Sequence, residues 1–380
     1  MSQKRFRPLP SADEVLLLRA ACLPKDEATQ AWQQWCARHG VQSIAKTETD
    51  LMPAIFRNVG PDALGEDAPI LRGTYRMVWV RNQMNFRAAA EVLRALRDQG
   101  TRTLLLKGAA LTAQVYKDEG VRPMSDVDVI VPLDRGEATL RLLYERGWGE
   151  WLPLTGDVRH VQHVLHSTGL QRADGASIDL HWHVLADCCD EGDDEDFWAS
   201  AVEIEFQGEP TLALCPADNL LVVLVHGLHW TEPRKLTWLQ DAYRLIAGEA
   251  GAIDWDRLVR QATKRRLALP VEAGLRSLRD DLGADVPPRV LDALRSAPST
   301  RIGRIDHRLQ GTKDDFAGVA LRTLVDYLKR SEHRPLADRA LGLVWLTQAL
   351  THSPSLGQVP GRIAGRFVNR GREFVQGERA

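Results

Sequence analysis

The sequence is poor in the cysteine patterns that build disulfide frameworks and zinc sites. Its 380 residues include five cysteines, an odd number, and no two of them form a C-x-x-C pair. Disulfide-rich domains and structural zinc sites depend on such pairing. We therefore expect free thiols, even at the adjacent Cys188 and Cys189, which lie near His183 in the sequence. The remaining cysteines are Cys22, Cys36 and Cys215.

Long apolar runs are also missing. The longest wholly aliphatic run, Leu220 to Val225, has six residues, whereas a helix that spans a bilayer needs roughly 18 or more. The first residues are basic, but Asp13, Glu14 and Arg19 interrupt the apolar stretch that a signal peptide would need. The sequence therefore predicts a cytoplasmic protein with no membrane partner.

A strong net charge is absent as well. The chain carries 49 Lys plus Arg against 51 Asp plus Glu, for a formal net charge of −2. Because no field of one sign surrounds the molecule, any site for a polyanion must be local. There is also no G-x-x-x-x-G-K-[ST], G-x-G-x-x-G, G-x-S-x-G or H-E-x-x-H motif, which argues against P-loop enzymes, Rossmann dehydrogenases, serine hydrolases and zinc proteases.

The pattern of what remains divides the chain into four regions. Residues 1–100 form an N-terminal helical region, 101–214 a core, 215–352 a C-terminal helical domain and 353–380 a basic tail. Ser11 and Glu14 predict a capping box at the start of the first helix. Residues 68–99 predict a long amphipathic helix, and its apolar face is formed by Met77, Val80, Met84, Ala88, Val92 and Leu96.

The core reads as an α+β fold with a small mixed sheet between the two helical regions. Strands are expected at 103–106 and 126–131, with a helix over 109–119 between them. A further helix is expected over 135–146, followed by strands at 159–167 and 176–184. Residues 187–196 contain seven acidic side chains in ten positions, which predicts a solvated loop or helix start.

The chemistry is concentrated in two of these strands. Asp126 and Asp128 lie two residues apart on one strand, so they share a face with Cα atoms roughly 6.6 Å apart. Two carboxylates repel each other unless a cation lies between them, and oxygen ligands suit Mg²⁺. Asp179 alternates in the same way with His181 and His183. If the two strands are neighbours, three acids converge, as two-metal phosphoryl or nucleotidyl transfer requires.

A second group of residues suits phosphate. Lys107 and Gly108 end a strand and begin a helix, where free backbone N–H groups and a close approach favour an anion. Arg122 precedes the Asp126 strand, and it could hold a triphosphate or pair with Asp126 or Asp128.

With these residues in place, the chain resembles the uncharacterised nucleotidyltransferases of the polymerase-β-like superfamily. The resemblance covers about Leu104 to Leu245. It rests on three motifs and on a later helical block with two histidines, a tryptophan and an aspartate: Lys107-Gly108, Arg122 with Asp126-Val-Asp128, Ile178-Asp179-Leu-His181-Trp182, and His226, His229, Trp238 and Asp241. The chain departs from the superfamily at Gly108-Ala109, where Gly-Gly or Gly-Ser is usual. A hydroxyl contact to phosphate is therefore missing, and Lys107 is expected to compensate.

The resemblance implies transfer of NMP from an NTP, with ATP the expected donor, to an acceptor hydroxyl or phosphate, releasing pyrophosphate. Asp126, Asp128 and Asp179 would then be catalytic and would bind two Mg²⁺ ions, while Lys107, Gly108, Arg122, Ser125 and His181 would bind the nucleotide. The acceptor, whether small molecule, peptide or RNA, is not specified. Two alternatives stay open: a non-catalytic nucleotide-binding module, and a metal-dependent phosphohydrolase built on His226, His229 and Asp241.

Overall fold

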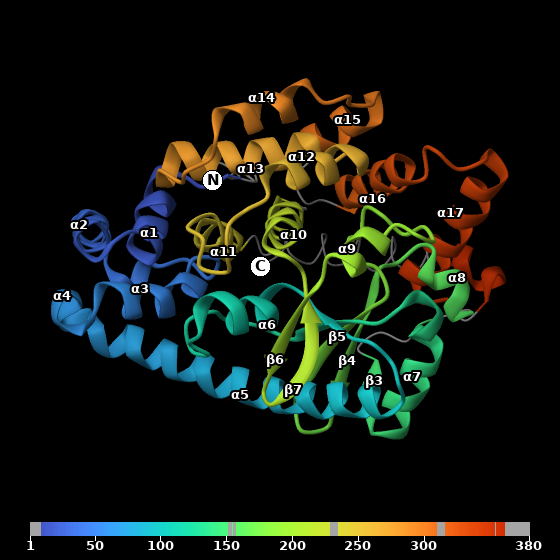
Figure 1. The fold of residues 1–380 in the computed structure, drawn as a ribbon, viewed down its shortest axis with the longest axis horizontal. Helices are drawn as coiled ribbons and strands as arrows, with labels where there is room; N and C mark the ends of the chain where they lie inside the picture. Colours follow the sequence, from blue (N-terminus) through green and yellow to red (C-terminus); the bar gives the residue numbers. More distant parts are fainter. Residues whose placement is uncertain are drawn as a thin grey trace, which may run out of the picture.

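The structure is a computed structural model, and it describes residues 9–150, 154, 157–228, 235–309, 316–353 and 355–361. One mixed sheet lies at its centre, with strands in the order β3-β4-β5-β2-β1-β7-β6. The strands are β1 (Leu104–Leu105), β2 (Val127–Ile130), β3 (Trp148–Glu150), β4 (Ser167–Arg172), β5 (Ser177–His181), β6 (Val202–Phe206) and β7 (Glu209–Ala213). Helices flank this sheet on both sides (Figure 1), which confirms the predicted α+β architecture.

The parallel pairing of β2 with β5 is the feature that organises the site. β2 also pairs antiparallel with β1, and β1 runs parallel to β7. β5 pairs on its other side with β4, antiparallel. Two segments far apart in sequence, each with a single charged face, are therefore adjacent in the middle of the sheet.

The helices of the N-terminal region are α1 (Ala12–Cys22), α2 (Lys25–Cys36), α3 (Met52–Val59), α4 (Pro61–Leu64) and α5 (Ala68–Asp98). The core adds α6 (Lys107–Leu111), the π-helical turn η4 (Thr112–Tyr116), α7 (Gly136–Glu145), α8 (Val158–Gln162) and α9 (Glu195–Ala199). Short 3₁₀ turns are η1 (Val41–Ser43), η2 (Thr49–Leu51), η3 (Gly65–Asp67), η5 (Leu133–Arg135) and η6 (Leu356–Gln358). As predicted, α1 begins with a capping box between Ser11 and Glu14.

The C-terminal region consists of helices packed above the sheet in Figure 1. They are α10 (Pro216–Leu228), α11 (Thr237–Ile246), α12 (Trp255–Lys264), α13 (Ala268–Leu282), α14 (Pro288–Ser296), α15 (Arg301–Leu309), α16 (Phe316–Arg330) and α17 (Leu336–Thr351). Most of the predicted basic tail, residue 354 and residues 362–380, falls outside the described residues. Among the described residues, no helix combines the length and the apolar character needed to cross a membrane.

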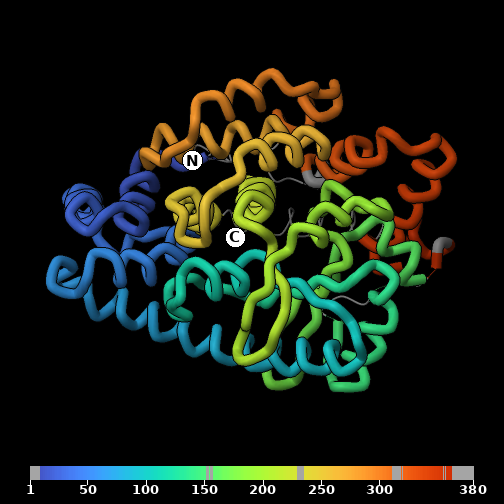
Figure 2. The backbone as a smooth tube through the Cα atoms, viewed as in Figure 1, coloured from blue at the N-terminus to red at the C-terminus, as the bar shows by residue number. Residues whose placement is uncertain are grey.

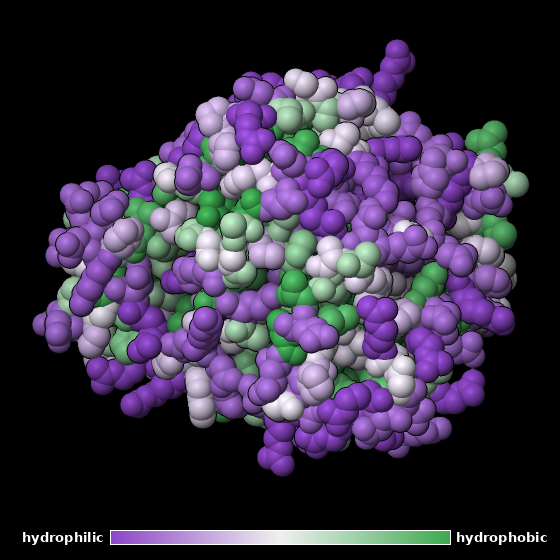
Figure 3. All heavy atoms as spheres, in the orientation of Figure 1, coloured by the Kyte–Doolittle hydropathy of each residue, from purple (hydrophilic) through white to green (hydrophobic). Residues whose placement is uncertain are grey.

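Two hydrophobic clusters cover the two faces of the sheet. One packs α5 and α7 against the face that carries Val127, Val129, Ile178 and Leu180. The other contains Ile130 of β2 and joins α1–α3 to α10–α14, and Figure 2 shows the blue N-terminal helices beside the yellow and orange C-terminal ones. Hydrophilic residues cover most of the molecular face in Figure 3, with small hydrophobic patches between them.

Two expectations about elements are wrong. Residues 159–167 do not form the predicted strand, because residues 159–162 belong to α8. The Asp157 side chain caps that helix by accepting a hydrogen bond from the Arg159 N–H, and Val161 and Val164, three residues apart, are buried. Spacing of three is helical, and the strand begins only at Ser167.

The predicted apolar face of the long helix is also only half correct. Met77, Val80 and Met84 of α5 are 49–58% exposed. The middle of α5 instead buries Val78, Asn82 and Asn85, and its last turns bury the predicted Ala88, Val92 and Leu96. The buried side therefore includes polar residues that the apolar pattern alone cannot find.

Candidate functional site

The two acidic strands place their carboxylates opposite each other. In the parallel β2–β5 pair, Asp128 and Asp179 are direct Cα partners. The apolar residues on either side of each aspartate point to the opposite face and are fully buried. Alternation along both strands therefore directs both acids to the face that α10 and α11 cover, as the sequence predicted for neighbouring strands.

Two basic side chains lie between these acids. Lys107 Nζ donates to Asp128 Oδ1 at 2.6 Å, and His181 Nε2 lies 3.0 Å from both Asp128 Oδ1 and Asp179 Oδ2. His181 Nδ1 is 3.1 Å from the His183 carbonyl oxygen. Since a carbonyl and a carboxylate only accept hydrogen bonds, both ring nitrogens of His181 carry protons. The ring is therefore an imidazolium.

The pKa values follow from this arrangement. Burial lowers the pKa of His181, but Asp179 and Asp128 outweigh it and raise the pKa to about 9. For Asp179, burial is outweighed by His181, which lowers the pKa to about 2. The pKa of Asp128 is lowered in the same way by Lys107 and His181. Both carboxylates are ionised at neutral pH.

Asp126 differs from the other two acids. It precedes β2, and its Oδ1 accepts a hydrogen bond from Ser125 Oγ at 3.1 Å. Burial, together with the charges of Asp128 and Asp179, raises its pKa to about 6 despite the opposing effect of Lys107. The charges of Asp128 and Asp179 therefore act on Asp126. Among the described residues, no basic side chain forms an ion pair with it.

A cation fits this cluster. Oxygen and nitrogen atoms of Asp128, Asp179 and His181 lie within 4.8 Å of one another, the one such group in the described part of the chain. Three carboxylates surround only two cationic side chains, so the site carries excess negative charge. Hard carboxylate oxygens of this kind suit Mg²⁺, whereas His181 holds protons on both nitrogens and is not a ligand in this state.

The start of α6 lies directly beside the acids. Lys107 has a φ of 46°, a left-handed conformation that is costly for a residue other than glycine and is found most often at functional sites. A Cβ on Gly108 would lie 2.3 Å from Arg122 Nη1 and 2.4 Å from Met124 Sδ. A side chain at this position would have to displace Arg122 and Met124, so glycine is what allows Arg122 to lie against the backbone at the start of α6.

Arg122 makes a buried ion pair that the sequence did not predict. Its Nε and Nη2 donate to both carboxylate oxygens of Asp241 in α11, at 2.8–3.0 Å. It forms no ion pair with Asp126 or Asp128. Tyr116 also donates to Asp241 Oδ1 at 2.6 Å. One carboxylate from the helical region therefore holds two residues of the core.

Asn82 and Asn85 are functional candidates that the sequence reasoning missed. Asn82 Nδ2 donates to the carbonyl oxygens of Glu119 and Arg122, and Asn85 Nδ2 donates to the Ser125 carbonyl oxygen. They hold the loop that carries Arg122 and Asp126. Asparagine is a poor helix former, so two of them three residues apart in the middle of a helix were a detectable signal.

Ser167 was missed as well, and His183 lies elsewhere. Ser167 Oγ donates to Asp179 Oδ2 at 3.1 Å, from the strand next to β5. His183 was expected on the face of Asp179, but β5 ends at His181. Its ring instead contacts Asp194 and the Gln162 carbonyl oxygen. Both ring nitrogens of His183 are thus occupied, which removes it from any zinc site with the buried Cys188 and Cys189.

Two cavities adjoin the helix formed by α6 and η4. One, of about 160 Å³, is lined by Lys107 at the start of that helix, by His166 just before β4, and by Val222, Val225 and His226 of α10. Its walls are mostly apolar. Burial and the neighbouring His181 lower the pKa of His166 well below its ordinary value, so this ring is neutral.

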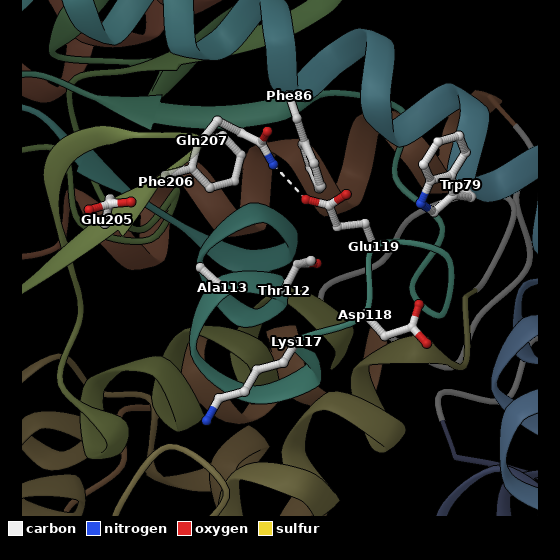
Figure 4. A pocket seen from close by; sticks show the side chains of 10 residues that line it. All are labelled: Trp79, Phe86, Thr112, Ala113, Lys117, Asp118, Glu119, Glu205, Phe206 and Gln207. Carbon is white, nitrogen blue, oxygen red and sulfur yellow. Dashed lines mark hydrogen bonds between the residues drawn. The ribbon is translucent and has the colours of Figure 1, made fainter.

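The other cavity, of about 500 Å³, lies at the far end of the same helix (Figure 4). Phe86 and Phe206 line it, and Gln207 bonds Glu119 across it. Its charged residues are three acids, Asp118, Glu119 and Glu205, against Lys117. A triphosphate would be repelled there, so its size does not make it the nucleotide site.

The residues of the phosphohydrolase alternative are only partly visible. Asp241 is bound by Arg122 and Tyr116. His226 lines the smaller cavity, and His229 lies outside the described residues. The structure therefore does not bring these three residues together as a described site.

The mixed sheet, the facing acids and the adjoining Lys-Gly helix start are the combination expected of a nucleotidyltransferase core. The family model for uncharacterised nucleotidyltransferases matches residues 30–283, which is more than half of the chain. The protein belongs to this family, and its class is that of the nucleotidyltransferases. No curated protein matches the chain.

Proposed function

We propose that the protein is a Mg²⁺-dependent nucleotidyltransferase that moves NMP from an NTP, with ATP as the donor, to an acceptor hydroxyl or phosphate and releases pyrophosphate. The observation that carries this proposal is the direct pairing of Asp128 with Asp179 across parallel strands, with Lys107 bonded to the first. Nucleotidyl transfer needs converging carboxylates and a cationic phosphate site, and the acids beside Lys107 support this proposal.

The acids would have distinct roles. Asp126, Asp128 and Asp179 would hold two Mg²⁺ ions, which supply the positive charge that neutralises the phosphates. Asp179 also keeps an accessible side, since its side chain is 21% exposed. With a pKa of about 2 it is a weak base. It would therefore accept the acceptor's proton only as that proton becomes acidic in the transition state.

The phosphates would lie against the start of α6. Lys107 would exchange its bond to Asp128 for a bond to phosphate, and Arg122 would contribute a fixed cation beside Gly108. Ser125 and His181 would complete the nucleotide contacts. The small cavity beside Lys107 and His166 has room for part of a substrate next to the acids, and we propose that acceptor and nucleotide meet there, between the core (101–214) and the C-terminal helical domain (215–352).

The acceptor is a small molecule, a peptide or an RNA, and the chain does not specify which. Five free cysteines fit the reducing cytoplasm, which we propose as the compartment of this protein.

The test is an assay for pyrophosphate with each NTP and Mg²⁺, run with a mass search for nucleotide added to co-purifying molecules. We expect pyrophosphate release that depends on Mg²⁺ and is largest with ATP. Release of inorganic phosphate from phosphoesters, with no pyrophosphate, would support the phosphohydrolase alternative. Nucleotide binding without turnover, across a panel of small-molecule, peptide and RNA acceptors, would support the non-catalytic alternative.

A further inference from the structure

A buried carboxylate of the helical region holds the arginine of the proposed phosphate site. Asp241 lies on α11, and its side chain is 2% exposed, while that of Arg122 is 14% exposed. The guanidinium and the carboxylate meet side by side through Nε and Nη2. Such a two-point contact fixes the plane of the guanidinium as well as its position.

The third nitrogen of this guanidinium, Nη1, does not bind Asp241. Arg122 Nη1 has one long hydrogen bond, 3.5 Å to the Pro123 carbonyl oxygen. It lies against Gly108, where any side chain would collide with it. The neighbouring Lys107 is bonded to Asp128. Asp241 therefore binds the Nε and Nη2 edge of the guanidinium and leaves Nη1 beside Gly108 at the start of α6.

Tyr116 ties the same carboxylate to the helix itself. Its hydroxyl donates to Asp241 Oδ1, and it is the last residue of η4, which continues α6. Burial and the charge of Asp241 raise its pKa well above the ordinary value, so the hydroxyl keeps its proton. Asp241 thus sets the position of Arg122 relative to the helix that begins at Lys107.

We infer that Asp241 is a positioning residue, which orients Arg122 so that its Nη1 binds the triphosphate of the NTP at the start of α6. This inference rests on the proposed function. Without Asp241, the Arg122 side chain would be mobile, and nucleotide binding would have to immobilise it. The cost of immobilising one such side chain corresponds to about a two- to tenfold loss of affinity.

Loss of Asp241 could also change nucleotide affinity in the opposite direction, so the sign of the change distinguishes two explanations. Asp241 neutralises part of the charge of Arg122, so its removal would strengthen attraction to phosphate if orientation did not matter. Weaker binding after loss of Asp241 therefore reports orientation, and stronger binding reports simple charge compensation.

The chain offers a closely matched control in Asp218. This aspartate of α10 is fully buried, and it binds Arg257 Nε and Nη2 at 2.9 and 2.7 Å. The pair has the same chemistry as Asp241 with Arg122, and it contacts Ser200 and not the site residues. Asp218→Asn should therefore reproduce the loss of stability of Asp241→Asn without its effect on nucleotide.

The experiment is calorimetric titration of α,β-methylene-ATP with Mg²⁺ into the wild type, D241N, D218N, R122A and the double variant R122A/D241N. We expect D241N to bind about two- to tenfold more weakly and D218N to bind like the wild type. The double variant should match R122A alone, because Asp241 acts only through Arg122. Unchanged or tighter binding by D241N, or a further loss in the double variant, would overturn the inference.

Failure of this inference is distinguishable from failure of the proposed function. A wild type that does not bind the analogue contradicts the proposed function, whereas a wild type that binds it with D241N unaffected contradicts only the role of Asp241. Circular dichroism identifies variants that fold. If D241N does not fold, Y116F removes one hydrogen bond from Asp241 and should weaken binding about twofold, and unaltered affinity in folded Y116F would overturn the inference.

Discussion

Residues 187–196 hold seven acidic side chains in ten positions, whereas the candidate site is built on three, Asp126, Asp128 and Asp179. In the acidic segment, four of the five half-buried or buried carboxylates form an ion pair with a base from another segment. Asp187 binds Lys329, Asp190 binds His333 and Arg334, Asp194 binds His183, and Asp196 binds Lys264. Through these ion pairs the segment connects the core to α12, to α16 and to the residues that follow α16.

At the candidate site, carboxylates outnumber cations. Lys107 and His181 serve both Asp128 and Asp179, and Asp126 is left with a raised pKa. Bases from other segments thus pair with four acids of the acidic segment and leave Asp193 with a raised pKa, while at the site three acids from neighbouring strands share two bases in a group that could hold a metal ion. The comparison teaches that local density of acids in a sequence is a poor guide to a metal site, and that strand register matters more.

The largest expected difference is in the rate of pyrophosphate release when one acid is removed from the site or from the acidic segment. Asp128→Asn should abolish pyrophosphate release, because Asp128 is paired with Asp179 at the centre of the site. Asp190→Asn, which removes a paired carboxylate of the acidic segment, should leave the rate unchanged. Steady-state pyrophosphate assays on both purified variants make the measurement. Equal losses in the two would erase the distinction between the regions.

Lys107 and Lys329, which both pair with aspartates, should differ in how Mg²⁺ affects the stability of their variants. Lys329→Met leaves Asp187 and Asp306 without their shared cation and should cost about 3–5 kcal/mol in free energy of unfolding. Lys107→Met likewise removes a cation from the buried Asp128 and should also lower the free energy of unfolding. Mg²⁺ should restore stability to Lys107→Met but not to Lys329→Met. Urea unfolding with and without Mg²⁺ measures this, and rescue of neither or of both contradicts the comparison.

Two aspartate–histidine pairs allow a catalytic role of an aspartate to be compared with a structural one. Asp179 with His181 and Asp194 with His183 have the same 3.0 Å contact. Asp179→Asn should lower the single-turnover rate by roughly 10²-fold, the low end of general-base contributions, and weaken nucleotide binding much less. Asp194→Asn should lose stability and keep its rate. Equal losses of rate and affinity in Asp179→Asn would make Asp179 an ordinary metal ligand.

The smallest effect should appear in the pH dependence of the metal-free protein. Asp126 has a folded pKa of about 6, above its ordinary 3.8, so its contribution to stability is complete below pH 3.8 and is lost as the pH rises through 6. The loss is on the order of 2–3 kcal/mol. Asp126→Asn should therefore become progressively more stable than the wild type between pH 4 and 7.

Asp196 provides a change of opposite sign. Lys264 lowers its pKa, so its contribution is present above pH 3.8 and is lost on acidification. Asp196→Asn should be less stable than the wild type at pH 7, and the difference should shrink toward pH 3. Melting temperatures across this range measure both variants, and slopes of the same sign would contradict the assigned causes.

Much of the site could be predicted because its signals are local. Alternation places Asp128 and Asp179 on defined faces of their strands, and the resemblance to a family supplies the neighbour relation that alternation alone cannot. Lys107 and Gly108 were identifiable at the strand-to-helix junction. These residues lie in the structure where the sequence placed them.

The remainder depends on contacts between distant segments. Asp241 lies 119 positions from Arg122, and no periodicity links them. Asn82 and Asn85 act through the carbonyl oxygens of a loop, which have no sequence signature. The helix over 158–162 was misread because a short apolar pattern fits both helix and strand, and the Asp157 cap decides between them.

The central claim is that the acids of β2 and β5 hold a metal together with a nucleotide. Thermal melting of the wild type with α,β-methylene-ATP, with and without Mg²⁺, tests it most directly, with Asp128→Asn beside it. The account predicts that the analogue raises the melting temperature of the wild type only when Mg²⁺ is present, and that Asp128→Asn shows no such rise. A wild type with no Mg²⁺-dependent shift on adding the analogue would contradict it.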